Sequence, residues 1–397
     1  MNILIFNCGS SSQGFKVYQA DRSGQAEIAS GKAKNVATKT QAEPRVDWKI
    51  GGATGSFQAD LSTHRLAAQA ILALLKEHGV AVDAIGHRFV HGGELFTQTT
   101  RIDEAALAQL RQCLPLAPIH NPNSYSVIEE CLEHLPGVPQ YAVFDTAFHA
   151  GMPEEARRYA LPRALADEYG FRKYGFHGLS YQYVSGQAAW LLGKPLDQLK
   201  LILCHLGTGG SSVAAVKAGR SLDTSMGFSP LPGLVMSTRS GDLDPEIVLE
   251  LIRSGYSADQ VDAILNNQSG LVGLSGFSSN LAEIIEASEA GNAECQVAYD
   301  VYAHRLETYL GAYTWLLDGA DAIAFTDDIG VKSWKLRARV CGKVENLGIQ
   351  LDLDANRSAP PDRPSRVSRE TSRTQVWVIP TDEELVILQE VLGQIGV

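Results

Sequence analysis

The sequence predicts an α/β fold built from two similar halves. Two short apolar runs, residues 3–6 and 201–204, each lead into a turn of small residues and then into a second apolar run. Other apolar runs alternate with segments of helical periodicity, a pattern typical of α/β proteins. The two turns are Asn-Cys-Gly-Ser-Ser-Ser at 7–12 and His-Leu-Gly-Thr-Gly-Gly-Ser-Ser at 205–212. Glycine lets the backbone approach an anion closely, and free N–H groups and serine hydroxyls bind its oxygens. The paired turns therefore predict a site for a chain of phosphates.

Four strands and one helix are expected in the first half. They are a strand, turn and strand over 1–18, a helix over 63–78, a strand over 84–90 and a strand over 141–144. The helix is amphipathic and ends at Gly79. Its expected apolar face comprises Leu66, Ala70, Ile71, Leu74 and Leu75. The last strand ends at Asp145, and open α/β sheets place their chemistry at the carboxyl ends of strands.

The second half begins near residue 148. The expected helices cover 178–192, 292–317 and 331–347, with a final helix from Glu383 to the C-terminus. The expected strands cover 201–204, 212–216, 321–326 and 376–379. The segment 355–372 is rich in proline, arginine and serine, so we expect a mobile surface loop there.

Composition restricts the class of protein. The 397 residues are 45% hydrophobic and carry a formal charge of −11, from 34 basic and 45 acidic side chains. This length suggests about two or three domains. An acidic protein is a poor non-specific partner for nucleic acid or an anionic membrane, so neither is expected as a partner. Any anionic substrate must therefore be bound by local arginine, histidine and backbone donors.

The start of the chain and its cysteines favour a cytoplasmic location. The N-terminus lacks the basic start of a secretory signal, and no apolar stretch approaches the roughly 20 residues needed to span a bilayer. The six cysteines are scattered without a CxxC pair and lie mostly in apolar segments: Cys8, Cys113, Cys131, Cys204, Cys295 and Cys341. We expect buried, reduced thiols.

Several blocks of residues, spread over nearly the whole chain, resemble the acetate kinase family, which belongs to the superfamily of actin, hexokinase and sugar kinases. In order, the blocks are 7–12, 86–93, 115–122, 144–149, 174–178, 223–227, 235–242 and 381–384. The resemblance implies two ribonuclease-H-like (actin-like ATPase) domains with an active-site cleft between them, and a homodimer. The implied domains are 1–147, joined by the C-terminal helix 384–397, and 148–383.

The family reaction is reversible phosphoryl transfer between acetate and acetyl phosphate, in line and with a divalent metal, Mg²⁺ or Mn²⁺. Such transfer needs negative charge to be neutralised and the reacting oxygens to be aligned. Arg88 and Arg239 match the family's active-site arginines, whose planar fork grips a carboxylate or phosphate. We expect Arg88 to bind the carboxylate and Arg239 to stabilise the transition state. The ordinary alternative for an isolated arginine is a salt bridge.

Histidine and carboxylate positions complete the implied site. His177 matches the histidine that donates to the transferring phosphoryl group, and His120 matches a second, less critical one; a lone histidine is otherwise a satisfied core residue. Asp145 matches the catalytic carboxylate. Acetate is already ionised at neutral pH, so Asp145 is interpreted chiefly as an anchor for metal or water. Asn7 and Glu383 match the magnesium site, although the first turn of a helix alone also favours Glu383.

The acyl pocket is expected to be small. In the family, Arg88 and His120 lie with four apolar positions that line the pocket, here Val90, Ile119, Phe176 and Pro230. Each of the four is also an ordinary core residue by composition. If they line the pocket, acetate fits and longer acids are crowded. One methylene changes discrimination by only about 1–3 kcal/mol, so weak reaction with propionate is expected.

The departures from the family pattern lie on the nucleotide side. Gly14 replaces the lysine that follows the triple serine in ATP-using members, and Thr208 replaces the asparagine of the second turn. The Asp-x-Arg of the adenosine site is lost in 279–282. The Gly-Gly-Ile-Gly-Glu loop reads Asp-Asp-Ile-Gly-Val at 327–331. The two carboxylates add bulk and negative charge where a polyanion is bound.

These departures favour pyrophosphate and orthophosphate over ATP and ADP as phosphoryl donor and product. They resemble the pyrophosphate-dependent branch of the family, which also carries a Thr-Gly-Gly-Ser-Ser turn and a Met-Ser-Thr-Arg block. The expected donor-binding residues are Ser10, Ser12, Lys16, His205, Gly207, Thr208, Gly209 and Gly210. Two alternatives stay open: a conventional ATP-dependent acetate kinase with a tolerant adenine site, and a non-catalytic protein that binds acetyl phosphate.

Overall fold

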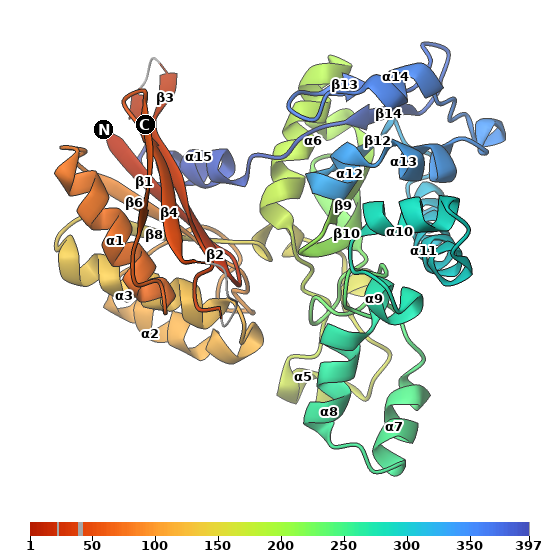
Figure 1. Cartoon of the computed structure of the whole chain (residues 1–397), viewed down its shortest axis with the longest axis horizontal. Helices are drawn as coiled ribbons and strands as arrows, with labels where there is room; N and C mark the ends of the chain where they lie inside the picture. The colour runs from red at the N-terminus through yellow and green to blue at the C-terminus, as the bar shows by residue number, and fades with distance from the viewer. Residues whose placement is uncertain (22–23, 39–42, 397) are drawn as a thin grey trace. The chain divides into compact units, whose positions relative to one another are not determined.

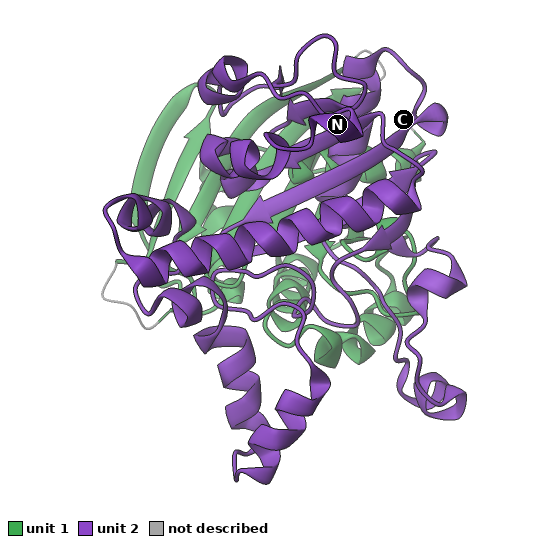
Figure 2. Cartoon of the chain, turned by 90° about the vertical axis from the view of Figure 1, so that its right-hand side faces the viewer, with its two compact units in different colours: residues 1–148, 382–397 green, residues 149–381 purple. Residues whose placement is uncertain are grey.

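The computed structural model describes residues 1–21, 24–38 and 43–396. The chain folds into two compact units, which Figure 2 colours separately. Unit 1 comprises residues 1–148 and 382–397, and unit 2 comprises residues 149–381. Within the described residues, no helix combines the length and apolar character that crossing a membrane requires.

Unit 1 is built on a mixed sheet with the strand order β5-β4-β3-β2-β1-β6-β8-β7 among the described residues. The strands are β1 (Asn2–Cys8), β2 (Ser12–Asp21), β3 (Gly24–Lys34), β4 (Arg45–Ile50), β5 (Ala53–Gln58), β6 (Ala84–Phe89), β7 (Thr100–Arg101) and β8 (Gln140–Phe144). β1 and β2 form an antiparallel hairpin, whereas β6 and β8 extend the sheet in parallel. The expected strands over 1–18, 84–90 and 141–144 are therefore confirmed.

Helices cover both faces of this sheet (Figure 1). They are α1 (His64–Glu77), α2 (Glu104–Gln112), α3 (Asn121–His134) and α15 (Glu383–Ile395). Leu4 and Phe6 share a core with α1 and α3. On the other face, a Cβ built on Gly86 would lie 2.7 Å from Ile387 and 3.0 Å from Val391, so α15 packs directly on the strand backbone.

α1 lies where the sequence predicts it, but its buried face matches the predicted apolar face only in part. The Thr63 hydroxyl accepts from the Leu66 N–H at 3.2 Å and begins the helix, and Gly79, at φ +67°, follows its end. Ile71, Leu74 and Leu75 are buried as expected. Leu66 and Ala70 are only half-buried, and the rest of the buried face consists of His64, Ala67 and Ala68.

Unit 2 repeats the strand arrangement of unit 1. Its order among the described residues is β11-β10-β9-β12-β14-β13. The strands are β9 (Lys200–Gly207), β10 (Gly210–Lys217), β11 (Arg220–Thr224), β12 (Ala322–Thr326), β13 (Ser365–Arg366) and β14 (Gln375–Val378). In each unit an antiparallel hairpin precedes two parallel strands, so β9, β10, β12 and β14 correspond to β1, β2, β6 and β8.

Most helices of unit 2 pack around this second sheet. α6 (Gly178–Leu192) lies on one face and α11 (Ala293–Leu316) lies on the other (Figure 1). The remaining helices are α4 (Glu154–Arg157), α5 (Arg163–Tyr169), α7 (Pro245–Arg253), α8 (Ala258–Ala263), α9 (Gly270–Ser275), α10 (Leu281–Glu289), α12 (Asp327–Lys332), α13 (Trp334–Cys341) and α14 (Leu353–Ser358). All six cysteines of the chain are buried free thiols.

The single helix expected over 331–347 is wrong. The structure has α12, a break at Ser333 with ψ 76°, α13, and a short 3₁₀ helix at Glu345–Leu347. The buried Arg337 explains the break, because its guanidinium donates to the carbonyls of Gly330 at 2.7 Å and Val331 at 2.8 Å. These donors satisfy carbonyls that a helix end leaves without intrahelical partners.

The surface loop expected over 355–372 is also wrong. The segment contains the end of α14 and β13, which pairs antiparallel with β14. Its polar residues bond inward: the Ser368 hydroxyl accepts from the Val376 N–H at 3.0 Å, and the Ser372 hydroxyl accepts from the Gln350 N–H at 2.9 Å. The high serine content predicted an exposed segment. In the structure these two serine hydroxyls instead accept hydrogen bonds from backbone N–H groups.

Candidate active site

The turn after β1 is the tip of a hairpin in unit 1. The Gly9 N–H donates to the Ser12 carbonyl at 2.8 Å and closes the turn, and His64 Nε2 bonds to the Gly9 carbonyl at 2.9 Å. Ser10 is exposed at the tip, and Ser12 begins β2. The register places Gly14 directly opposite Asn7.

Arg88 and Asp145 form a largely buried two-point ion pair in unit 1. Arg88 Nε donates to Asp145 Oδ1 at 3.0 Å and Nη2 donates to Oδ2 at 2.5 Å. Arg88 Nη1 also donates to Asn7 Oδ1 at 3.1 Å. The pair arises because β6 and β8 are neighbours: Arg88 lies near the end of β6, and Asp145 directly follows β8. Arg88 has five N–H donors, so two remain for a ligand after these bonds.

The first turn of α15 brings acidic side chains to the same place. Asn7 Nδ2 donates to Glu384 at 2.9 Å and to Glu383 at 3.4 Å. Glu383 lies 3.8 Å from Arg88 Nε. Burial lowers the pKa of Arg88, but Asp145 and Glu383 outweigh burial and hold that pKa above its usual value. Asn7, Arg88, Asp145 and Glu383, four of the predicted residues, are therefore neighbours.

Lys16 joins these acidic residues rather than pointing to the serine turn. Its Nζ lies 3.1 Å from Asp382 and 3.6 Å from Glu384. Burial lowers the pKa of Lys16, but Glu384 and Asp382 reverse this effect and raise it. Lys16 therefore holds the start of α15 against β2 in this structure.

The donor set of this cluster suits a hard divalent cation. Carboxylates and an amide oxygen are the ligand types that Mg²⁺ takes up. Four carboxylates, of Asp145 and residues 382–384, exceed the two cations Arg88 and Lys16 by two charges. Among the described residues, these carboxylates do not converge within 4.8 Å as a cage. The arrangement fits Mg²⁺ bound by few protein ligands and several waters.

Asn121, a residue that the sequence analysis missed, joins two predicted substrate-binding segments. Its Oδ1 accepts from the His91 N–H at 3.1 Å, and its Nδ2 donates to the carbonyls of His91 at 3.0 Å and Cys113 at 2.7 Å. Val90 is buried beside this bond, whereas Ile119 is 59% exposed and His120 is half-buried. Asn121 thereby fixes the loop after β6 against the start of α3.

The second turn, in unit 2, is a two-residue hairpin loop. Gly207 pairs with Gly210, which leaves Thr208 and Gly209 exposed at the tip. Asp328 occupies the donors of this loop: it accepts from the Thr208 N–H at 2.9 Å and from the Thr208 hydroxyl at 3.0 Å. The aspartates that stand where the family has two glycines therefore have a structural consequence. The donors of Thr208 are already bonded to Asp328 of the same unit.

Asp327 bonds to the histidine that precedes the loop. Its Oδ2 lies 3.1 Å from His205 Nε2, and His205 Nδ1 lies 2.8 Å from the Ser180 hydroxyl. An ionised carboxylate only accepts, so the hydrogen is on Nε2. Asp327 has φ +61°, and a side chain at Gly207 would collide with its carboxylate.

His177 stacks on His205. The ring centroids are 4.0 Å apart with an interplanar angle of 22°. His177 Nδ1 lies 2.8 Å from the Ser212 hydroxyl, which also bonds to the Tyr181 hydroxyl at 2.5 Å. His177 precedes α6 at φ +60°, so a left-handed residue sets the direction of its ring. Ser212 and Tyr181 were not recognised from the sequence because each resembles ordinary core packing.

Arg239 reaches the same hairpin. Its guanidinium donates to the carbonyls of Pro230 at 3.2 Å and Gly209 at 3.4 Å, and to Met236 Sδ at 3.6 Å. A Cβ built on Gly210 would lie 3.2 Å from Arg239 Nη1 and 3.5 Å from His177 Nε2. These two predicted residues therefore converge on one point of the turn. Burial lowers the pKa of Arg239.

The remaining predicted residues of unit 2 have structural contacts. Phe176 is buried, and its carbonyl bonds to His149 Nε2 at 3.0 Å. Pro230 is half-buried and bonds to Arg239 as described. In the stretch 279–282, the Asn280 side chain accepts from the Ala282 N–H at 2.9 Å and caps α10.

The whole chain matches one protein family. Residues 2–389 match the family model described as the acetokinase family. The acetate kinase of Dictyoglomus turgidum is 42% identical over 405 residues, which cover 100% of this chain and 98% of that protein. The acetate kinase of Acetivibrio thermocellus is 41% identical over 400 residues, which cover 99% of this chain and 98% of that protein.

Solved structures resemble the chain over the same length. The crystal structure of acetate kinase from Entamoeba histolytica matches with a TM-score of 0.90 at 40% identity, covering 99% of each chain. That of a propionate kinase from Francisella tularensis matches with a TM-score of 0.89 at 35% identity, covering 98% of each chain. These matches confirm the expected two-domain α/β fold of the actin-like ATPase class. The chain is a member of the acetokinase family.

Proposed function

We propose that the protein is an acetate kinase, which transfers a phosphoryl group reversibly between acetate and acetyl phosphate. The proposal rests on family membership and on the two groups of neighbouring residues described above. Transfer between two oxygens needs cations and donors around the phosphoryl group, and each unit presents an arginine at a small-residue hairpin.

In this proposal Arg88 binds the carboxylate of acetate through its two remaining donors. Asp145 holds Arg88 in position and anchors metal or water, since acetate needs no base to ionise it. His177 and Arg239 bind the transferring phosphoryl group at Gly210. Asn7 and Glu383 hold Mg²⁺ or Mn²⁺, which supplies positive charge to the phosphate oxygens when bound. His120 acts as a secondary donor.

We further propose that the phosphoryl donor is pyrophosphate and the product orthophosphate. The observation that carries this proposal is the acid pair at the second hairpin: Asp328 takes the Thr208 donors and Asp327 takes His205 Nε2. A nucleoside would have to lie beside these carboxylates, and Asn280 is engaged as a helix cap. In the reverse direction, acetyl phosphate and orthophosphate give acetate and pyrophosphate.

The donor-binding role of the two hairpins then requires an exchange of partners. A phosphate that reaches Thr208 or His205 must displace the carboxylates of Asp328 or Asp327. Ser10, Ser12, Gly207 and the backbone of residues 209–210 contribute further donors. Lys16 contributes only if it leaves Asp382 and Glu384.

The acyl pocket is proposed to accept acetate and, weakly, propionate. Val90, Ile119, Phe176 and Pro230 are the proposed lining. The solved relative from Francisella tularensis is a propionate kinase. One methylene changes discrimination by only about 1–3 kcal/mol, which supports weak activity with propionate. We also propose a cytoplasmic homodimer in which the two units are the two domains.

Two incubations test the proposal. The purified protein receives acetyl phosphate and Mg²⁺ with either orthophosphate or ADP, and pyrophosphate or ATP is measured. We expect pyrophosphate from the first incubation and little ATP from the second. An Arg239→Ala preparation run in parallel reports any contaminating kinase.

The other outcomes separate the alternatives. ATP formation without pyrophosphate formation overturns the donor assignment and leaves a conventional acetate kinase. Measurable binding of acetyl phosphate with no transfer to either acceptor overturns the enzyme proposal in favour of a binding protein.

A further inference from the structure

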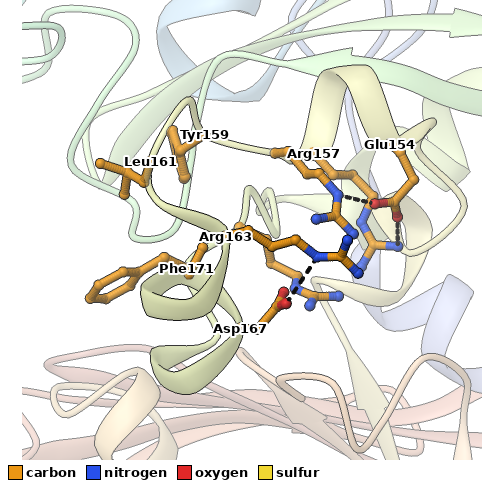
Figure 3. A pocket seen from close by; sticks show the side chains of 10 residues that line it. Glu154, Arg157, Tyr159, Leu161, Arg163, Asp167 and Phe171 are labelled. Carbon is orange, nitrogen blue, oxygen red and sulfur yellow. Dashed lines mark hydrogen bonds and ion pairs between the residues drawn. The ribbon is translucent and has the colours of Figure 1, made fainter.

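A second cationic site lies in unit 2, around α4, α5 and the two residues Phe171 and Arg172 that follow α5 (Figure 3). It is a cavity of about 90 Å³, and none of its lining residues belongs to the proposed transfer site. Among the described residues, its charged lining consists of four arginines and two carboxylates: Arg157, Arg158, Arg163, Arg172, Glu154 and Asp167.

Two of the arginines are held opposite each other by the backbone. Arg158 and Arg172 pair in an isolated antiparallel bridge. Residues directly opposite in such a bridge have neighbouring side chains, and like charges in this position are destabilising. The fold therefore places two cations together, and Glu154 lies near enough to both for their charge to lower its pKa.

The carboxylates of the lining neutralise only part of this charge. Glu154 lies 2.5 Å from Arg158 Nε but 3.9 Å from Arg157 Nη1. Asp167 lies 3.5 Å from Arg163 Nε. Arg157 Nε is buried without a hydrogen-bond acceptor among the described residues. A buried donor on a charged group is costly to leave unpaired, so it indicates an acceptor that the chain itself does not provide.

We propose that this cavity binds a phosphate-type oxyanion, orthophosphate or one end of pyrophosphate. The planar guanidinium group donates pairs of hydrogen bonds that match phosphate oxygens. A water needs only about 10–15 Å³ of such space, so this cavity has room for one tetrahedral anion. The lining carries four arginines and two carboxylates, so an anion with two negative charges brings the net charge of the lining to zero. The site goes beyond the proposed function and does not depend on it.

Calorimetric titration of the full chain with orthophosphate, and separately with pyrophosphate, tests the proposal. The titrations use an Arg239→Ala background, which removes the proposed transfer-site cation and leaves this cavity unchanged. We expect saturable binding that Arg157→Gln with Arg163→Gln weakens at least tenfold, since each substitution removes charged hydrogen-bond donors to the anion. The two titrations show which phosphate the cavity prefers.

Two variants control for effects on folding. Arg253→Gln removes an exposed arginine of α7 that also pairs with carboxylates, and it is expected to leave binding unchanged. Asp167→Asn removes an acid from the cavity and is expected to tighten binding about two- to fivefold, the range of an exposed ion pair. A general loss of structure would weaken phosphate binding in Asp167→Asn as well as in Arg157→Gln with Arg163→Gln. Opposite changes in these two variants therefore exclude it.

The proposal fails if the Arg239→Ala chain binds neither phosphate, or if the Arg157 and Arg163 substitutions weaken binding no more than Arg253→Gln. It also fails if these substitutions change sedimentation but not phosphate affinity, because the arginines then serve a contact between copies of the chain. The proposed kinase activity is measured by turnover in the unmodified protein, so either conclusion can fail alone.

Discussion

Arg239 has acceptors but no described carboxylate partner. Its guanidinium contacts two carbonyls and a thioether sulfur. Burial lowers the pKa of Arg239. In contrast, neighbouring carboxylates raise the pKa of Arg88. A half-buried cation at a small-residue turn without a described carboxylate partner is well suited to an incoming phosphate. Arg88 is already charge-paired and suits positioning and carboxylate binding.

Arg239→Ala is therefore expected to lower kcat at least a hundredfold, because a transition-state arginine contributes about 10³–10⁵ in rate in related chemistry. The fold persists, since the lost bonds are few and lie at a loop. Turnover and thermal unfolding measured on the same preparation check this. Arg239→Lys, which keeps the charge without the fork, is the control and is expected to recover only part of the rate. A near-normal rate for the alanine variant would show that another residue stabilises the transition state.

Replacing Asp327 and Asp328 together by glycine is expected to leave ADP a poor acceptor. The change removes two carboxylates and frees the Thr208 donors, but Asn280 and Ala282 still lack the charges of an adenosine site. The measurement is kcat/KM for ADP beside that for orthophosphate. Asp327→Asn with Asp328→Asn, which removes charge but keeps volume, separates repulsion from crowding. Efficient ATP formation by the glycine variant would contradict the prediction.

The sequence identified single residues better than their partners. Arg88 and Asp145 were identified separately, from blocks that match the family, and only the structure shows that they form an ion pair. Lys16 was expected at the donor, but the structure pairs it with Asp382, more than 360 residues along the chain. A contact across that separation has no local signature, and neither does the bond from Asn121 to His91.

Arg337 determines how one element ends and another begins. It is 1% exposed and makes four hydrogen bonds, two to carbonyls at the end of α12 and two to Asn356 within α14. Burial lowers its pKa to about 10. The side chain thus joins α12, α13 and α14.

Arg337→Met is expected to destabilise unit 2 by at least ~3 kcal/mol, because it leaves buried carbonyls unpaired. For a unit of this size, that corresponds to a fall of about 6–12 °C in the unfolding midpoint. Differential scanning calorimetry measures it. The control is Arg339→Met on the same helix, whose half-exposed pair with Glu307 is worth no more than about 1 kcal/mol. Equal shifts for the two variants would refute the role of Arg337.

The elements that the sequence analysis missed share one physical cause. Periodicity predicted the long, regular segments such as α6 and α11 and the buried strands. β3 to β5 were missed because they are largely exposed and rich in polar residues. The helix over 331–347 and the loop over 355–372 failed because buried polar side chains bond to backbone there, which composition does not reveal.

At the scale of the molecule, the duplicated hairpin predicted the two-part fold correctly. Both turns connect an antiparallel pair, and both pairs continue into two parallel strands. What the repeat did not predict is the specialisation of each unit. Unit 1 gathers carboxylates around Arg88, whereas unit 2 gathers histidines around its turn and closes that turn with Asp327 and Asp328.

Unit 1 depends on the two ends of the chain coming together, and Gly86 is where they meet. Ile387 and Val391 of α15 pack on this glycine. Gly86→Val is expected to push α15 away, at about 1–3 kcal/mol for overpacking, and to lower the unfolding midpoint by roughly 2–12 °C. Because α15 also carries Glu383 and Glu384, the variant is expected to need more Mg²⁺ for half-maximal turnover.

Gly186→Ala provides the matched comparison, since this glycine lies within α6 and nothing is within 4 Å of the added Cβ. There, a side chain is expected to stabilise the helix by about 0.5–1 kcal/mol and leave the metal requirement unchanged. Thermal unfolding measures the stability of both variants, and a Mg²⁺ titration of turnover measures their metal requirement. If Gly86→Val lowers stability without changing the metal requirement, α15 supports unit 1 only through packing, and its carboxylates have no part in holding the metal.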